Sequence, residues 1–198
     1  MFVTFEGLDG SGKSTQADLL REALIAEGRN VVATREPGGT DFGERVRDLL
    51  LHGQELTPWA EAALFAAARA ELVARVIRPA LEDGADVVCD RYIDSSLAYQ
   101  GIARGLGVER VLELNLQAMQ GLLPDRTFLI LLDPSESAWR AGTEPDRIER
   151  EGSDFRSAVD RAYRDLAAMF PKRVVALDGS KSARDLAVEI RGQVRELS

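Results

Sequence analysis

The chain has 198 residues, of which 45% are hydrophobic and 29% are charged, as in one well-buried globular domain. Its net charge of −8 argues against wrapping nucleic acid, because a basic face is needed to displace counterions from the phosphate backbone. No stretch approaches the roughly 18 apolar residues that span a bilayer, and the opening MFVTFEG carries no signal-peptide pattern, so we expect one cytoplasmic domain over residues 1–198 with no membrane partner.

Strand-like and helix-like patterns alternate along the chain, the first as short apolar runs and the second with apolar residues three or four positions apart. In chain order, the predicted elements are a strand at 2–6, a helix at 14–27, a strand at 31–34, helices at 40–51 and 58–82 (the second kinked near Pro79), a strand at 85–90, a helical pair between 92 and 121, strands at 127–133 and 173–178, and a helix at 182–197. This alternation predicts an α/β fold, a parallel five-stranded sheet flanked by helices on both faces.

Residues 140–153, RAGTEPDRIEREGS, are the one stretch without apolar periodicity. A solvated surface loop would have this composition, and so would a mobile lid over a binding site. The position of the segment, between the fourth and fifth predicted strands, leads us to favour the lid.

A phosphate-binding loop lies between the first strand and the first helix. Residues 7–14, GLDGSGKS, fit the pattern G-x-x-x-x-G-K-[ST], and the strand before and helix after them are the context that the motif requires. The glycines let successive backbone N–H groups point at phosphate oxygens, and the helix N-terminus favours an anion. Lys13 is expected to reach the β- and γ-phosphates of ATP, and Ser14 to ligate Mg²⁺. The predicted ATP-binding residues are Gly7, Leu8, Asp9, Gly10, Ser11, Gly12, Lys13, Ser14 and Thr15.

Three classes of protein share such a loop: small-molecule kinases, regulatory nucleotide switches and partitioning-type ATPases. A guanine-nucleotide switch usually reads its base through N-K-x-D, but neither Asn30 nor Asn115, the two asparagines of the chain, precedes a lysine. A partitioning ATPase carries an extra lysine early in the loop, and this loop has only Lys13. These differences favour a kinase.

Six segments carry a resemblance to a known family. They are FEGLDGSGKST, TREPGGT, ERVRDLLL, LFAAARAEL, DRYIDSSLAYQG and DRIE, and in this order they resemble the thymidylate kinase family over nearly the whole chain. The resemblance implies transfer of the γ-phosphoryl group of Mg·ATP to dTMP, giving dTDP and ADP for dTTP biosynthesis. Another nucleoside monophosphate kinase, or a non-kinase switch, is the alternative. We also expect a homodimer, with the apolar-rich helix at 58–82 as a candidate dimer face.

A dianionic acceptor phosphate must be held in line with ATP, which calls for forked cations. Arg91 follows the third strand, at the carboxyl edge of the sheet where ligands bind in such folds, and Arg47 lies on the helix after TREPGGT. By resemblance, both arginines grip the acceptor phosphate, Arg35 supports the TREPGGT loop, and Glu36 orients the acceptor site.

The nucleobase is expected beside the helix that carries Phe65 and Arg69, which are four residues apart and share a face. By resemblance, Phe65 stacks on thymine and Arg69 donates to a ring carbonyl, although a core Phe with a solvated Arg has the same spacing. Ser96 and Gln100 resemble the polar edge of the base pocket. Tyr99 resembles the residue that crowds the sugar 2′ position and favours deoxyribose.

Two carboxylates are expected beside the phosphates. By resemblance, Asp9 positions the acceptor sugar and the loop, and Asp90, at the end of the third strand, holds Mg²⁺ through water as a Walker-B aspartate does. The alternative interpretation of either residue is a helix or turn cap.

Phosphoryl transfer also needs a cation that closes on the developing charge, and arginine suits this role. The loop residues 8–11, LDGS, include no arginine, so the lid is expected to supply it. We predict that Arg140 or Arg147 acts as this cation, with Arg150 a lesser candidate. With Lys13, Asp9 and Arg91, these two arginines complete the predicted catalytic set.

Overall fold

Five short apolar strands form one parallel sheet in the computed structural model, which describes residues 1–142 and 146–197. The strand order is β2-β3-β1-β4-β5, and every neighbouring pair is parallel. The strands are β1 (Phe2–Glu6), β2 (Val31–Arg35), β3 (Asp86–Asp90), β4 (Arg126–Leu131) and β5 (Val174–Asp178). All five lie where the sequence predicts strands, and the parallel α/β fold is confirmed.

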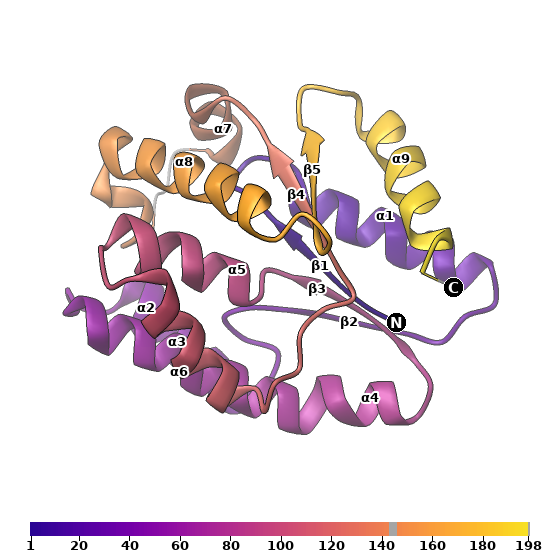
Figure 1. Ribbon diagram of the computed structural model, residues 1–198, viewed down its shortest axis with the longest axis horizontal. Coiled ribbons are helices and arrows are strands. Elements are labelled where there is room, and N and C mark those ends of the chain that lie inside the picture. Colours follow the sequence, from indigo (N-terminus) through magenta and orange to yellow (C-terminus); the bar gives the residue numbers. More distant parts are fainter. Residues whose placement is uncertain (143–145, 198) are drawn as a thin grey trace.

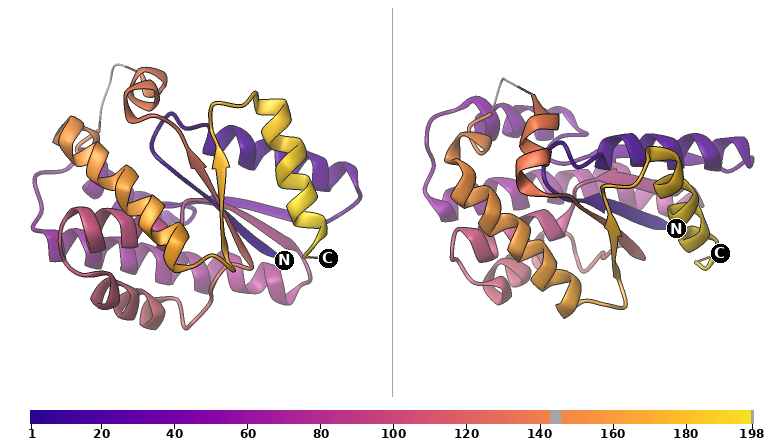
Figure 2. Two further views of the ribbon diagram at one scale, coloured as in Figure 1. Left: turned by 45° about the horizontal axis from the view of Figure 1, so that its top comes forward. Right: turned by 90° about the horizontal axis from the view of Figure 1, so that it is seen from above.

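Helices connect the strands and cover both faces of the sheet (Figures 1 and 2). They are α1 (Lys13–Ala26), α2 (Asp41–His52), α3 (Pro58–Leu72), α4 (Arg78–Glu82), α5 (Ile93–Ser96), α6 (Val108–Ala118), α7 (Pro134–Ala141), α8 (Ser153–Met169) and α9 (Ala183–Arg195). Within residues 1–142 and 146–197, no helix is long and apolar enough to cross a membrane.

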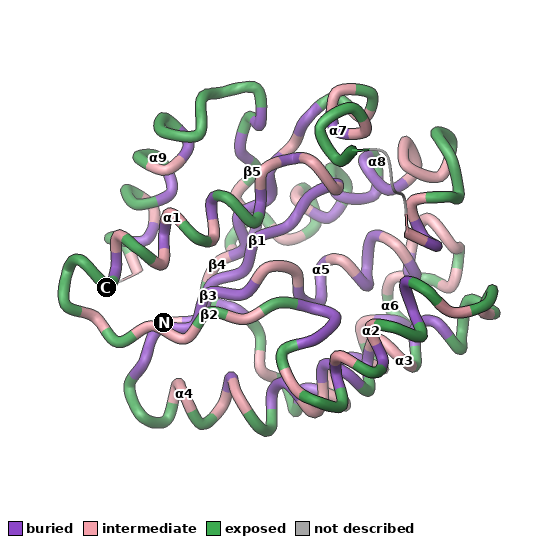
Figure 3. The backbone as a smooth tube through the Cα atoms, turned by 180° about the vertical axis from the view of Figure 1, so that it is seen from behind, coloured by how far each residue is buried: buried purple, intermediate pink, exposed green. Residues whose placement is uncertain are grey.

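Each face of the sheet has its own hydrophobic cluster, because side chains alternate between the two faces along a strand. On one face, Phe5 packs in a cluster with Leu20 of α1 and Ile190 of α9. On the other, Phe2 belongs to a cluster that includes Leu166 of α8. Figure 3 shows the buried strands at the centre and exposed residues along the outer sides of the helices.

The helix predicted at 58–82 is continuous but changes its winding. A π-helical segment, Val73–Ile77, separates α3 from α4, and Pro79 lies in the first turn of α4. Proline has no N–H for the helical bond to the residue four positions earlier, and π-helical winding changes the bonding pattern just before it. The irregularity thus begins at Val73, ahead of the proline.

Two helices, α7 and α8, have no counterpart among the predicted elements. In α8 the buried residues include Val159, Ala162, Tyr163 and Leu166, whose spacing is that of one helical face. The pattern was therefore present in the sequence. The short α7 begins at Pro134, and its cap Asp133 accepts a bond from the Ser135 N–H at 2.9 Å.

The carboxyl ends of β2, β3 and β1 are neighbours, because these strands are adjacent in the sheet. The backbone N–H of Glu36 donates to the backbone carbonyl oxygen of Asp90 at 2.9 Å, and the backbone N–H of Arg91 donates to that of Phe5 at 2.9 Å. Ligands of parallel sheets bind outside this edge. Three predicted site segments, the phosphate-binding loop, residues 35–36 and residues 90–91, therefore lie side by side.

Candidate active site

The phosphate-binding loop follows β1 directly, and two of its glycines are required by close approach. A Cβ at Gly7 would lie 2.5 Å from the carbonyl oxygen of Ile130, and one at Gly10 would lie 2.2 Å from that of Ser137. Both residues also have positive φ, 141° and 84°. The loop backbone therefore packs closely against both β4 and α7.

Helix α7 is fastened to this loop. The hydroxyl of Ser137 donates to the carbonyl oxygen of Asp9 at 2.6 Å, and Ser137 is fully buried. Arg140 lies in the last turn of the same helix, where its guanidinium pairs with Glu136 at 2.5 Å. The pair is partly exposed. The predicted catalytic cation Arg140 thus comes from a helix that touches the loop.

The carboxylate of Asp9 receives two cations. Its Oδ1 lies 2.8 Å from Lys13 Nζ and 2.6 Å from Arg91 Nη2, and Lys13 also donates to the carbonyl oxygen of Leu8 at 3.3 Å. Burial acts to raise the pKa of Asp9, but Arg91 and Lys13 outweigh it and hold that pKa well below its usual range. Burial lowers the pKa of Lys13. Three predicted catalytic residues are therefore in direct contact.

Arg91 has a positive φ of 67°, which is uncommon for a residue other than glycine. Its Nη1 donates to Ser95 Oγ at 3.0 Å and to the Tyr163 hydroxyl at 3.2 Å, while Nη2 holds Asp9. Its side chain also lies over the ring of Tyr99, 5.6 Å from the centroid. The guanidinium is thereby fixed between the loop and α5.

A buried carboxylate, Glu6, contacts the hydroxyl groups that hold Arg91. It accepts bonds from the Tyr92 N–H at 2.8 Å, the Ser95 hydroxyl at 2.6 Å and the Tyr163 hydroxyl at 2.9 Å. Burial, followed by the nearby charge of Asp94, raises the pKa of Glu6 to about 7. Glu6 thus orders the two hydroxyls that contact Arg91.

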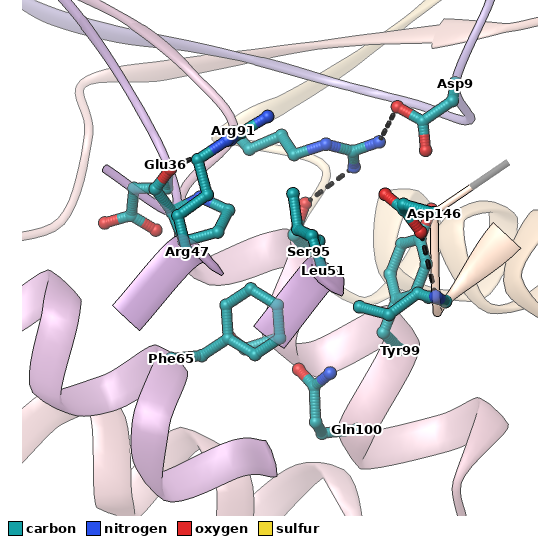
Figure 4. Close-up of a pocket in the computed structure, with 13 residues that line it drawn as sticks. Asp9, Glu36, Arg47, Leu51, Phe65, Arg91, Ser95, Tyr99, Gln100 and Asp146 are labelled. Atoms are coloured by element: carbon teal, nitrogen blue, oxygen red, sulfur yellow. Dashed lines mark hydrogen bonds and ion pairs between the residues drawn. The ribbon is translucent and has the colours of Figure 1, made fainter. Parts of the chain in front are cut away.

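A cavity opens beside Asp9 and Arg91 (Figure 4). Its lining includes every residue predicted for the acceptor except Arg69. These lining residues are Asp9, Glu36, Arg47, Phe65, Arg91, Ser96, Tyr99 and Gln100, together with Pro37, Leu51, Ser95, Asp146 and Ile148. Figure 4 shows Arg47 and Arg91 toward one side of the cavity, and Phe65 and Gln100 toward the other. The cavity therefore has a cationic end and an end with an aromatic ring and an amide.

Arg47 is partly buried, and its Nη1 donates to the carbonyl oxygen of Pro37 at 2.9 Å. Burial, with the nearby charge of Arg35, lowers the pKa of Arg47. Arg35 itself pairs with Glu44 at 3.1 Å, and Glu44 also accepts from the Gly39 N–H at 2.9 Å. Arg35 is thus connected to the TREPGGT loop through Glu44.

Arg69 differs from its predicted role at the base. It is 1% exposed, and all five of its N–H donors point to protein acceptors. Nε and Nη2 hold the Glu36 carboxylate at 2.9 and 2.5 Å, and the remaining donors reach Ser96, Asn115 and the Tyr92 carbonyl. A bond to a base carbonyl would have to displace one of these. In this arrangement Arg69 positions Glu36 and Ser96.

Arg147 also differs from its predicted role. It is 7% exposed, its Nη2 lies 2.6 Å from Glu61 Oε2, and its Nε donates to the Leu50 carbonyl at 2.7 Å. Breaking a buried ion pair costs several kcal/mol, about 3–5 in measured cases. The role of catalytic cation does not fit a side chain held in this way. Residues 143–145 of the predicted lid lie outside the described residues.

The residues predicted to hold Mg²⁺ are in contact with each other. Ser14 Oγ donates to Asp90 Oδ2, and the other oxygen, Asp90 Oδ1, is buried with no hydrogen-bond partner. Such an oxygen suits a hard cation or its water ligands. No cluster of three or more His, Cys, Asp or Glu side chains suited to a metal occurs in the part of the chain that the structure describes. The pair fits a Mg²⁺ ion that takes its other ligands from nucleotide phosphates and water.

Several residues of the site escaped the sequence analysis. Glu6 and Glu61 are fully buried carboxylates, and Ser95 and Asp146 line the cavity. A signal existed for the first two, since Glu6 ends an apolar strand and Glu61 interrupts an alanine-rich helical face. Nothing local distinguishes Ser95 from Ser96.

Comparison with known proteins gives a consistent result. The family model for thymidylate kinase matches residues 5–190. A thymidylate kinase of Bifidobacterium longum (strain DJO10A) is 49% identical over 203 residues, covering 100% of this chain and 98% of the relative. One from Leifsonia xyli subsp. xyli (strain CTCB07) is 51% identical over 195 residues, covering 96% and 92%. The crystal structure of thymidylate kinase from Ehrlichia chaffeensis has 36% identity and a TM-score of 0.78, covering 98% of each chain. The chain therefore belongs to the thymidylate kinase family and is a nucleoside monophosphate kinase, as its motifs predicted.

Proposed function

We propose that the protein transfers the γ-phosphoryl group of ATP to dTMP, with ATP on the phosphate-binding loop and dTMP in the adjoining cavity. The observation that carries this assignment is the polarity of the cavity, cationic beside the loop and aromatic at the far end (Figure 4). A deoxynucleoside monophosphate has the same polarity. Its phosphate lies at one end and its base at the other.

At the phosphate end, Arg47 and Arg91 hold the acceptor phosphate, and Asp9 keeps Arg91 aligned with the loop. The loop amides and Lys13 bind the β- and γ-phosphates of ATP. An acceptor phosphate oxygen attacks the γ-phosphorus in line, the bond from that phosphorus to the β–γ bridging oxygen breaks, and ADP leaves, so no covalent enzyme intermediate is needed. At the other end, Phe65 stacks on the base.

Ser14 and Asp90 are the residues that would hold Mg²⁺. When bound, the ion neutralises charge on the transferring phosphates. Ser14 lies on α1 and Asp90 ends β3, and the hydrogen bond between their side chains holds the two together. Both side chains would therefore be in place to hold the ion.

We assign the cation of the transition state to Arg140. Its partner Glu136 is a partly exposed neighbour on α7, and exposed pairs contribute about 0–1 kcal/mol, so Arg140 exchanges partners at little cost. The described parts of the segment 140–153 act with it as the lid, and closure would exclude water from the reaction.

The test is a coupled ADP-release assay with Mg·ATP and a panel of dTMP, dUMP, dCMP, AMP, CMP and GMP. The highest kcat/KM is expected for dTMP, and ATP turnover without an acceptor should be slow. A preference for AMP, CMP or GMP would move the protein to another monophosphate kinase class. Rapid acceptor-free hydrolysis would favour an ATPase.

We further propose that residues 1–198 form a single kinase domain that works in the cytoplasm as a homodimer. Exposed apolar side chains on the packed helices α2 and α3 support a dimer face, namely Phe42 (47% exposed), Leu49 (56%) and Trp59 (39%). Sedimentation equilibrium should give twice the chain mass of 21.7 kDa. A monomer mass at micromolar concentration would contradict the dimer.

A further inference from the structure

Glu61, on α3, is a fully buried carboxylate that the proposed chemistry does not use. Three side chains from other elements converge on it. Gln100 Nε2 donates to Oε1 at 2.9 Å, Arg104 spans both oxygens at 3.0 and 3.1 Å, and Arg147 donates to Oε2 at 2.6 Å. Of these partners, Gln100 lines the acceptor cavity.

This carboxylate determines which way the Gln100 amide faces. Burial acts to raise the pKa of Glu61, but the bonds from Arg104, Gln100 and Arg147 outweigh it and lower that pKa. An ionised carboxylate can only accept hydrogen bonds, so it must face the amide nitrogen of Gln100. The carbonyl Oε1 is left for the cavity, and Figure 4 shows it on the Phe65 side.

We propose that Glu61 is a positioning residue that fixes the carbonyl of Gln100 toward the nucleobase, and so makes the cavity select bases with a ring N–H. The inference rests on the proposed function and extends it to base specificity. Thymine and uracil carry a hydrogen on N3, which a fixed carbonyl accepts. Cytosine has a lone pair there, which the same carbonyl repels. A buried polar group left unpaired in this way gives strong discrimination.

The test compares three monophosphates in the wild-type enzyme and in Glu61→Gln. The variant keeps the shape of the side chain but presents both a donor and an acceptor. The side-chain amide of Gln100 can then adopt either of its two flipped orientations. The assay measures KM for dTMP and the constants for competitive inhibition by dCMP and dUMP. We expect the preference for dTMP over dCMP to fall by about tenfold or more. The preference for dTMP over dUMP should change less than threefold, because uracil keeps the N3 hydrogen.

Glu71, on the same helix as Glu61 and outside the lid, provides a matched control. It pairs with Arg75, at 3.1 Å, and does not line the cavity. Glu71→Gln should leave both preferences unchanged, and thermal unfolding of each variant monitors the fold. If Glu61→Gln does not fold, the charge-balanced Glu61→Gln/Arg104→Gln variant takes its place.

Two outcomes would overturn the proposal. An unchanged dCMP preference in folded Glu61→Gln would do so, and so would an equal change in both preferences, which indicates general loosening of the cavity. A third measurement needs no variant. Wild-type enzyme should bind N3-methyl-dTMP at least about tenfold more weakly than dTMP, and equal binding would refute the carbonyl assignment. Failure of the wild type to phosphorylate dTMP would instead count against the proposed function.

Discussion

Arg91 Nη2 lies 2.6 Å from Asp9 Oδ1, and this ion pair joins the phosphate-binding loop to the acceptor cavity. The same carboxylate oxygen is 2.8 Å from Lys13 Nζ. One aspartate therefore aligns the lysine on the donor side with the arginine on the acceptor side. Displacement of either cation is expected to disturb the in-line geometry.

Arg91→Lys keeps the charge but removes the fork that contacts Asp9, Ser95 and Tyr163 together. We expect kcat/KM for dTMP to fall by about 100-fold or more, since misplacement of about 1 Å can cost that much. Steady-state kinetics would measure this. Arg75→Lys, at an exposed pair on the same fold, is the control. A loss below threefold at Arg91 would contradict the assignment.

Arg140→Ala and Arg147→Ala should have different consequences. Arg140→Ala is expected to lower kcat by about 10³-fold, as for an arginine finger, with little change in stability. Arg147→Ala leaves Glu61 with one cation fewer and should lower the free energy of unfolding by about 3–5 kcal/mol. Turnover numbers and urea unfolding curves separate the two. If both variants keep kcat within a few-fold, the lid supplies no catalytic cation at these positions.

Phe65→Ala should weaken dTMP binding without affecting the phosphates. An aromatic stack contributes about 0.5–1.5 kcal/mol beyond the area that it buries, so KM for dTMP should rise by roughly tenfold. The KM for ATP serves as the internal control and should stay constant. A loss in kcat with unchanged KM would place Phe65 outside the base site.

Glu6 predicts a pH dependence of stability. Its pKa is raised from 4.5 to about 7 by burial and by Asp94, so between these values the folded state binds more protons than the unfolded state. The contribution of Glu6 to stability is therefore present below pH 4.5 and is lost as pH rises to about 7. Glu6→Gln removes this pH-dependent contribution. Between pH 5 and 8, the free energy of unfolding should therefore fall less in the variant than in the wild type, and the two decreases should differ by ~1–3 kcal/mol. Parallel pH profiles of the two proteins would refute this.

Asp90→Asn should raise the Mg²⁺ concentration needed for half-maximal activity, because it removes the charge from an oxygen that has no protein partner. We expect an increase of roughly tenfold, by analogy with altered metal-site partners. A Mg²⁺ titration at saturating ATP and dTMP measures it. An unchanged requirement would exclude Asp90 from the metal site.

The sequence by itself determined the features that depend on neighbouring residues. The loop at 7–15 is contiguous, and the strands follow from short apolar runs, so local spacing was enough to predict the loop and the sheet. Motif order also identified most of the cavity lining. Helix α8 was not among the predicted elements, although its apolar residues have the spacing of one helical face. Its sequence alone was therefore sufficient to predict it.

Only the tertiary structure decided the partners of the buried charges. From the sequence, Arg69 and Arg147 were predicted to be cations available to a ligand. In the fold, Arg69 is paired with a carboxylate 33 residues away and Arg147 with one 86 residues away. A buried charge must be paired, and which partner it finds depends on how distant segments pack. For the same physical reason, the orientation of Gln100 follows from Glu61, which no local pattern connects to it.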